Sequence, residues 1–207
     1  MGLPGACDIP PRANDLTIRL ASEADLDALV RLAAAFRNHL GLSTPADADL
    51  GASLTHLLQD TATEFFLACN ACGMPLGYVQ ARYRYSAWTT ALEAELEDVF
   101  VIREARRSGV GLRLVAFAIT RATARGCHTI GLNTNERNVG AVALYLRLGF
   151  ETARARWQGS RQLWLTIVLE ATGGLERMVP SALATAGLPV VVVNPRQGRD
   201  FARATGQ

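Results

Sequence analysis

Long apolar runs and an excess of charge of one sign are both missing from this sequence of 207 residues. Nowhere do eighteen apolar residues follow one another, and the first fifteen residues lack the basic region and apolar stretch of a signal peptide. The 21 basic and 19 acidic residues leave a formal net charge of +2. This charge gives no field that would favour nucleic acid or a membrane surface as a partner. We therefore expect a cytoplasmic protein that binds neither.

Cysteine is scarce as well. The four cysteines do not have the spacing of a secreted disulfide scaffold, so we expect reduced thiols. Cys69 and Cys72 form one C-x-x-C pair, but neither a second pair nor suitably spaced histidines follow it, and a structural zinc site needs four ligands. The sequence therefore predicts no metal site, and we interpret the pair as part of a hairpin turn.

Hydrophobic periodicity predicts a chain that alternates between strands and helices, with enough residues for one domain and a sizeable core. From Ser108 to about Arg125, the apolar residues Leu112, Val115, Ala116, Ile119 and Ala122 recur at helical spacing. The predicted order is β-α-α-β-β-β-α-β-α-β-β, with elements at 15–20, 22–41, 47–60, 64–70, 76–85, 94–102, 108–125, 128–134, 138–148, 150–157 and 161–169.

The segment "RRSGVG" places Arg106 and Arg107 just before two glycines, Gly109 and Gly111, at the predicted start of a helix. A helix start presents unpaired amide donors and the positive end of the helix dipole, and glycine lets the backbone approach a bound group closely. This combination favours a phosphate-binding loop. The dinucleotide fingerprint G-x-G-x-x-G and the lysine of a P-loop are both absent, so the usual nucleotide motifs do not apply.

Two motifs resemble those of the Gcn5-related N-acetyltransferases. They are Arg106-x-x-Gly109-x-Gly111 and, after the next predicted strand, Asn138-x-x-Ala141-x-x-x-Tyr145 followed by "LGF". The resemblance covers residues 15–169, with a departure at Arg103, where the family often has proline. It implies an α/β (α+β) fold with a mixed, strongly bent central sheet flanked by helices on both faces.

The resemblance also implies acetyl-CoA as co-substrate. Amides of the loop would bind the pyrophosphate, and the end of the preceding strand would pair with the pantetheine arm and offer an amide to the thioester oxygen. Asn138 is expected to cap its helix, to bind the pantetheine arm, or both. The cofactor-binding residues are thus predicted to be Val99, Phe100, Val101, Arg106, Arg107, Ser108, Gly109, Val110, Gly111 and Asn138.

In this family an acceptor amine attacks the thioester directly, without a covalent enzyme intermediate. Tyr145 lies where many members place a general acid for the departing thiolate; the alternative is a ring that only fills the core. An ammonium group must also lose a proton, and the candidates are Glu95, Glu97 and Asp98, of which we favour Glu97. Strand alternation puts Glu95 and Glu97 on one face and Asp98 on the other, although a bulge can re-aim one of them.

Residues 170–207 differ in composition from the rest. Through "EATGG", "AGLPVVVVNPRQ" and "RDFARATG" they resemble an internal fragment of insertion-sequence transposases with an RNase-H-like (RuvC-like) domain. Glu170 would correspond to one metal-binding acid, but two-metal chemistry needs several carboxylates. We expect an N-terminal tail over 1–14, an acetyltransferase domain over 15–169, and a transposase-like remnant over 170–207.

The sequence thus predicts an enzyme that transfers acetyl from acetyl-CoA to an amine of a small molecule or peptide. Two alternatives are a catalytically inactive acyl-CoA-binding sensor and a transposition or nucleic-acid-binding protein that acts through its C-terminal segment. The second lacks a basic stripe with interleaved aromatic residues. The acceptor is open among aminoglycosides, polyamines, amino acids and protein amines. Dimerisation is common in the family, so a homodimer is an expected assembly.

Overall fold

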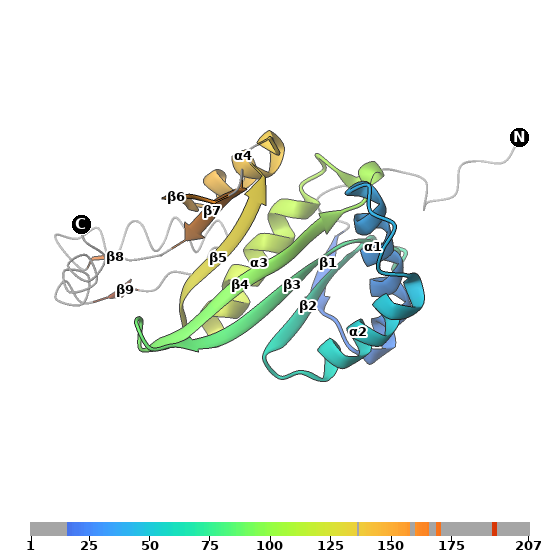
Figure 1. The fold of residues 1–207 in the computed structure, drawn as a ribbon, viewed down its shortest axis with the longest axis horizontal. Coiled ribbons are helices and arrows are strands. Elements are labelled where there is room, and N and C mark those ends of the chain that lie inside the picture. The colour runs from blue at the N-terminus through green and yellow to red at the C-terminus, as the bar shows by residue number, and fades with distance from the viewer. Residues whose placement is uncertain (1–15, 136, 158–159, 166–168, 171–191, 194–207) are drawn as a thin grey trace, which may run out of the picture. The chain divides into compact units, whose positions relative to one another are not determined.

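The computed structural model describes residues 16–135, 137–157, 160–165, 169–170 and 192–193 (Figure 1). The predicted order of strands and helices is confirmed over residues 17–165. The elements are β1 (Thr17–Leu20), α1 (Leu26–His39), α2 (Asp47–Gln59), β2 (Thr63–Cys69), β3 (Pro75–Ser86), β4 (Ala91–Val101), α3 (Val110–Ala124), β5 (Cys127–Asn135), α4 (Val139–Arg147), β6 (Glu151–Trp157), β7 (Ser160–Leu165), β8 (Leu169–Glu170) and β9 (Val192–Val193).

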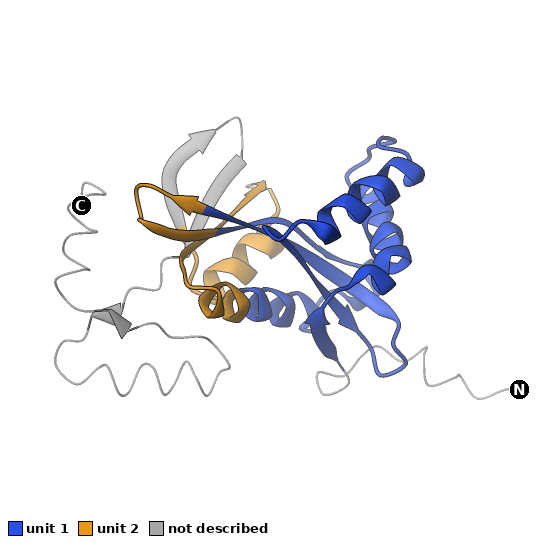
Figure 2. Ribbon diagram, turned by 90° about the horizontal axis from the view of Figure 1, so that it is seen from below, with its two compact units in different colours: residues 1–84, 94–118 blue, residues 85–93, 119–207 orange. Residues whose placement is uncertain are grey.

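The chain forms two compact units (Figure 2). The first contains residues 1–84 and 94–118, and the second contains residues 85–93 and 119–207. In the first unit, β1 to β4 are neighbours in sequence order. Strands β1 and β2 are antiparallel with Leu20 opposite Phe66, and β2 and β3 are antiparallel with Phe66 opposite Val79.

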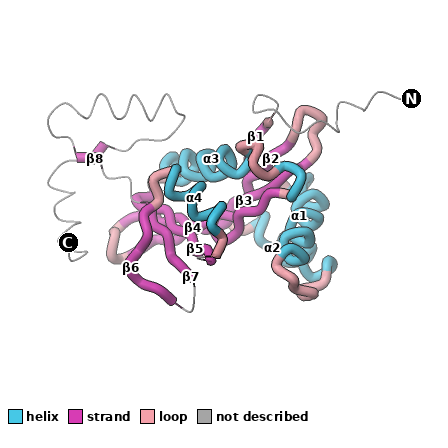
Figure 3. The backbone as a smooth tube through the Cα atoms, turned by 90° about the horizontal axis from the view of Figure 1, so that it is seen from above, coloured by secondary structure: helices cyan, strands magenta, loops and turns pink. Residues whose placement is uncertain are grey.

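Strand β2 is buried along its whole length because helices cover both faces of the first unit's sheet. Leu29 and Leu32 of α1 and Leu54 of α2 pack with Phe65 on one face, where α1 and α2 lie beside each other (Figure 3). On the other face, Phe66 meets Phe117 of α3, with ring centroids 5.3 Å apart. Burying each such side chain contributes about 1.5–3 kcal/mol. The predicted arrangement of helices on both faces is confirmed here.

Helix α3 begins at Val110, two residues later than predicted, because Gly109 has a left-handed backbone with φ of 89°. Its buried face is also rotated from the predicted one. Leu112 and Ala116 are only half-buried, whereas Leu114 and Ala118 are fully buried. The buried set is Val110, Leu114, Val115, Ala118, Ile119 and Ala122.

In the second unit, the start of β4 is followed in the sheet by β5, β7 and β6. Strands β5 and β7 are antiparallel with Leu132 opposite Leu163, and β6 and β7 are antiparallel with Thr152 opposite Leu163. The predicted turn at Gly159 lies outside the described residues. No helix in the described part of the chain is both long and apolar enough to cross a membrane.

Most of the predicted transposase-like segment, 171–191 and 194–207, also lies outside the described residues. The short strands β8 and β9 pair in parallel, with Leu169 opposite Val192 and Glu170 opposite Val193. Strand β9 falls within the predicted apolar run Val190–Val193.

Candidate active site

The loop between β4 and α3 leads into the helix with backbone amides that have no backbone acceptor in the described part of the chain. The Arg106 amide donates to the Arg103 carbonyl at 3.2 Å, and the Arg113 amide donates to the Gly109 carbonyl at 3.1 Å. Between these two, among the described residues, no amide in the range 107–112 donates to a backbone carbonyl. Left-handed conformations at Arg107 (φ 65°) and Gly109 (φ 89°) turn the chain within this loop. Several amide donors at a helix N-terminus form a site suited to an anion.

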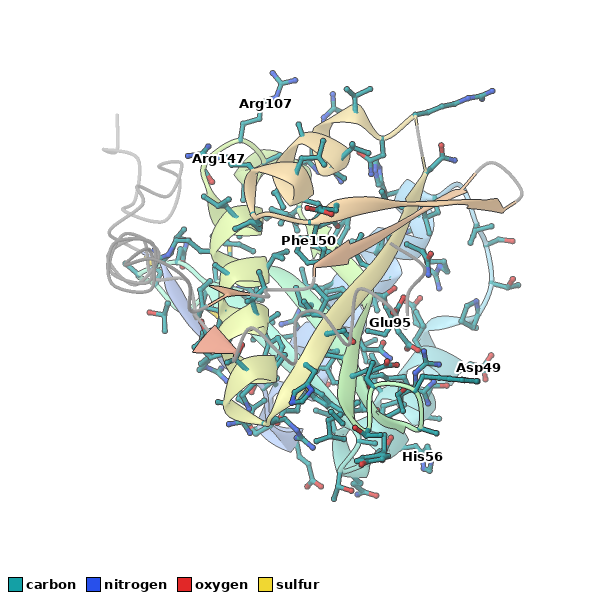
Figure 4. The ribbon with its side chains drawn as sticks, turned by 90° about the vertical axis from the view of Figure 1, so that its left-hand side faces the viewer. Asp49, His56, Glu95, Arg107, Arg147 and Phe150 are labelled. Atoms are coloured by element: carbon teal, nitrogen blue, oxygen red, sulfur yellow. The ribbon has the colours of Figure 1, made fainter. Side chains whose placement is uncertain are left out.

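The two arginines of this loop have different environments. Arg106 Nε donates to the Val101 carbonyl at 3.0 Å, and its guanidinium lies 5.8 Å from the centroid of the Phe100 ring. Arg107 is exposed, and its side chain extends away from the loop (Figure 4). The side chain of Arg106 therefore ties the loop to the end of β4, whereas Arg107 presents its charge to solvent.

The end of β4 lies against a wall of aromatic side chains. Phe100 is buried, stacks on Phe36 of α1 at 5.2 Å between centroids, and lies 6.4 Å from both Tyr78 and His39. Val99 and Val101, on either side of it, are half-buried. The Phe100 side chain belongs to the core, so only the backbone of this residue is suited to contact a ligand.

The acidic residues of β4 interrupt the alternation expected of a strand. Gln80 Nε2 donates to Glu97 Oε2 at 2.7 Å, and the Tyr78 hydroxyl donates to Asp98 Oδ2 at 2.9 Å. Tyr78 and Gln80 are two residues apart on β3 and share a face. Two adjacent residues of β4 thus both reach donors on this face of β3. Strand alternation, which predicts opposite faces for Glu97 and Asp98, does not account for this pair of contacts, whereas a bulge of the kind that we considered would.

The two carboxylates differ in environment. Glu97 accepts a second hydrogen bond, from Arg82 Nη1 to Oε1 at 3.3 Å, and its side chain is 36% exposed. Asp98 is more enclosed, and burial raises the pKa of its carboxyl. The hydrogen bond from Tyr78 opposes this rise, and the negative charge of Glu97 adds to it. Glu95, the third candidate, is half-buried on the same strand (Figure 4).

In the second unit, the Tyr145 ring is buried against Phe150, with centroids 5.7 Å apart. Burial raises the pKa of its phenol to about 12, so the group stays protonated at neutral pH. Thr129 Oγ1 is the only fully buried side-chain N or O atom without a partner in the described residues. The Tyr145 hydroxyl is not among these partnerless buried atoms.

Asn138 caps α4, because its Oδ1 accepts a hydrogen bond from the Ala141 amide at 3.3 Å. The structure thus shows the capping role that we expected for this residue. In the first unit, Asn70 Oδ1 accepts from the amides of Cys72 and Met74 at 3.0 and 2.8 Å, which forms the hairpin turn predicted around the C-x-x-C pair. No group of three or more potential metal ligands was found in the described part of the chain.

An α+β fold with an amide-lined loop leading into α3 is the architecture of an N-acetyltransferase. Comparison with known proteins agrees: the model of the acetyltransferase (GNAT) family matches residues 28–150. The chain belongs to this family. The matched region is an N-acetyltransferase domain, and acetyl-CoA is the co-substrate of the family.

Individual relatives match different shares of the chain. Aminoglycoside N(6')-acetyltransferase type 1 of Stenotrophomonas maltophilia is 32% identical over 143 residues, which are 67% of this chain and 88% of that protein. An N-acetyltransferase of Methanocaldococcus jannaschii is 34% identical over 90 residues, but the match spans only 38% of that protein. The crystal structure of a probable acetyltransferase has a TM-score of 0.64 at 23% identity, covering 69% of this chain and 95% of that chain, which shows a shared fold.

Proposed function

We propose that this protein transfers the acetyl group of acetyl-CoA to a primary amine by direct attack of the amine on the thioester. The observation that carries the proposal is the row of unpaired amides at 107–112, ahead of α3. A pyrophosphate is an anion of the size that such a row of donors binds, and the family match covers this loop.

In this proposal the amides from Arg107 to Gly111 bind the pyrophosphate, and the exposed guanidinium of Arg107 adds positive charge. The backbone of Val99, Phe100 and Val101 pairs with the pantetheine arm and offers an amide to the thioester oxygen, where negative charge develops during attack. Arg106 and Ser108 support this arrangement through their hydrogen bonds to Val101 and Ala105. Asn138 contributes by fixing the start of α4.

For the chemical step, we propose that Tyr145 donates a proton or a hydrogen bond to the departing sulfur. Its phenol, which stays protonated at neutral pH, supports this role. A carboxylate of β4 accepts the proton of the attacking ammonium; from sequence alone we favoured Glu97.

For the acceptor, we propose an amine of a small cationic molecule, with amino sugars of the aminoglycoside class as the first group to test. The support is the relative that acts on aminoglycosides, which is matched over 88% of its length. Acidic side chains on β4 are compatible with a cationic acceptor because they complement its charge.

The test has two parts. Acetyl-CoA is titrated calorimetrically into the purified protein, and thiol release is then followed over a panel of aminoglycosides, polyamines, amino acids and peptides. Binding with turnover of an amine supports the proposal. Binding without turnover on any amine indicates the acyl-CoA sensor instead, and absence of binding contradicts both.

We further propose that residues 170–207 are a transposase-derived passenger, that the protein is cytoplasmic and that it forms a homodimer. The passenger and dimer proposals rest on the sequence resemblances described above. A variant that ends at Leu169 should fold and bind acetyl-CoA like the full chain; loss of folding would contradict the passenger hypothesis. Light scattering on both forms tests the dimer, and cell fractionation tests the location.

A further inference from the structure

Asp98 is held in place by a buried tyrosine. The Tyr78 hydroxyl donates to Asp98 Oδ2 at 2.9 Å, and the Tyr78 residue is 1% exposed. The Tyr78 ring lies 6.4 Å from both Phe65 and Phe100, and Phe100 in turn stacks on Phe36 of α1. Since these neighbours fix the ring, the phenol fixes one oxygen of the Asp98 carboxylate. The other oxygen, Oδ1, has no hydrogen-bond partner within the residues that the structure describes.

Glu97 is less suited to accept a proton. Each of its oxygens already accepts a hydrogen bond, Oε2 from Gln80 and Oε1 from Arg82. A proton from an ammonium group would have to compete with one of these two donors for either oxygen. Because Glu97 and Asp98 both accept hydrogen bonds from side chains on one face of β3, both lie beside the end of β4 that we assign to the thioester. The two neighbouring carboxylates therefore differ in whether an oxygen is available to accept a proton.

We propose that Asp98, positioned by Tyr78, is the carboxylate that accepts the proton from the acceptor ammonium, and that Glu97 only shapes the charge around it. This inference rests on the proposed function and replaces our sequence-based preference for Glu97. In this proposal Asp98 is the catalytic residue, since it would take the proton directly from the acceptor nitrogen, and Tyr78 is a positioning residue.

The ammonium nitrogen loses two protons during the proposed reaction. One proton of the ammonium moves to Asp98 Oδ1, and the freed nitrogen lone pair attacks the thioester carbon. The carbon–nitrogen bond forms, the carbon–sulfur bond breaks, and the thiolate leaves with the bonding electrons and takes a proton from Tyr145. The nitrogen loses its second proton through water, which restores Tyr145, while Asp98 releases its proton to solvent. The overall reaction releases one proton for each ammonium acetylated.

The surroundings of Asp98 shape its protonation. Burial is the largest cause of its raised pKa, and a higher pKa makes a carboxylate a better acceptor for an ammonium proton. The charged or titratable groups around it are Glu95 and Glu97 on β4, Tyr78 and Arg82 on β3, His39 on α1 through its contact with Phe100, and Arg106 of the loop. Only Tyr78 among these donates a hydrogen bond to Asp98.

The experiment compares Asp98→Asn, Tyr78→Phe and Glu97→Gln in the full-length protein, using an amine that the wild type acetylates. Asp98→Asn should lower kcat/KM by about 100-fold or more, within the range for loss of a general base. Its acetyl-CoA affinity should stay within about twofold of wild type, which also reports folding. Glu97→Gln is the matched control, because it removes a neighbouring charge from the same strand, and it should cost less than about tenfold.

Tyr78→Phe tests the positioning role through the pH dependence of kcat/KM, which a purely structural role of Tyr78 would not change. The Tyr78 hydrogen bond lowers the pKa of Asp98, so its loss should shift the acid limb of the kcat/KM profile to higher pH while activity on the alkaline side is largely kept. An unshifted limb, or an Asp98→Asn rate within threefold of an active wild type, would overturn the assignment alone. A wild type that binds acetyl-CoA but acetylates no amine would overturn the proposed function, and this inference with it.

Discussion

Gly77 of β3 faces the backbone of β4 so closely that a Cβ on residue 77 would collide with the Phe100 carbonyl oxygen and lie 3.1 Å from Val101 Cα. These contacts are with backbone atoms at the strand end that we assign to the pantetheine arm. The close approach of the two strands therefore requires glycine at this position.

Gly77→Ala should accordingly push β4 away from β3. We expect a loss of unfolding free energy of about 1–3 kcal/mol, as for overpacking, and weaker binding of acetyl-CoA. Urea denaturation and calorimetry measure the two effects. Gly140→Ala is the control, since a Cβ there meets nothing within 4 Å and lies in helix α4, so wild-type or slightly higher stability is expected. Equal stability of both variants would contradict the steric argument.

Gly109→Ala tests whether acetyl-CoA binding depends on the backbone conformation of the loop between β4 and α3. A Cβ at Gly109 has open space, but the φ of 89° is unfavourable for alanine by about 1–2 kcal/mol. Gly126→Ala has the same open space and a φ of 79°, at the end of α3. Both variants should lose similar stability in urea, and only Gly109→Ala should bind acetyl-CoA more weakly. Parallel loss of binding in both would show that the effect is not local.

Arg107→Asn removes the exposed charge of the loop and keeps a residue type that tolerates a left-handed backbone. The expected result is about a three- to tenfold weaker acetyl-CoA affinity, as for one exposed ionic contact, with a smaller dependence on salt. Calorimetry at two ionic strengths measures both. Arg31→Gln, an exposed position on α1, should leave affinity and salt dependence unchanged. An unchanged salt dependence in Arg107→Asn would argue against contact with the pyrophosphate.

Tyr145→Phe removes one hydroxyl and keeps the ring that packs on Phe150. We expect kcat to fall by about 10- to 100-fold, with near-normal stability and acetyl-CoA affinity. Since the pKa of Tyr145 is raised to about 12, its deprotonation should not limit the wild-type rate below about pH 11. Full activity of the variant would show that the Tyr145 hydroxyl has no catalytic role and that the ring only packs in the core.

Asp25 provides a prediction for stability against pH. Its carboxylate accepts two hydrogen bonds from Arg19, at 2.7 and 2.6 Å, and this pairing is the main cause of its pKa falling to about 2. The stabilisation is complete above the unfolded pKa near 4 and is lost as the pH falls toward 2. Allowing for solvent screening of this partly exposed pair, about 1 kcal/mol should be lost between pH 5 and pH 2. Urea denaturation of wild type and Asp25→Asn tests this, because the variant should lack that portion of the decline.

Periodicity and turn chemistry were sufficient to predict the order of elements over residues 17–165, since amphipathic segments form the same type of element in most contexts. The rotation of α3 was not predictable in the same way. Leu112 and Leu114 both fit a helical apolar pattern, and only packing against the sheet determines which of them is buried.

The candidate site shows a similar division. The amide-lined loop was predictable because its glycines and arginines are adjacent in sequence. The pairing of Asp98 with Tyr78 was not, because twenty residues separate them and the sequence does not show which residues of β3 lie opposite which residues of β4. Likewise, the sequence alone does not distinguish Arg106, whose side chain donates to the Val101 carbonyl, from Arg107, whose side chain is exposed.

The tie between Arg106 and Val101 has a consequence for the kinetics of binding. Together with the bonds from Ser108 to Ala105 and from the Arg106 amide to Arg103, it holds residues 101–108 in one shape through hydrogen bonds within the chain. Fixing a residue's backbone costs about 1–2 kcal/mol. If the loop is already ordered, little of this entropy cost remains to be met when acetyl-CoA binds. Association should then occur in a single fast phase, without a slow rearrangement, and differences in affinity among variants of this loop should be found mainly in the dissociation rate.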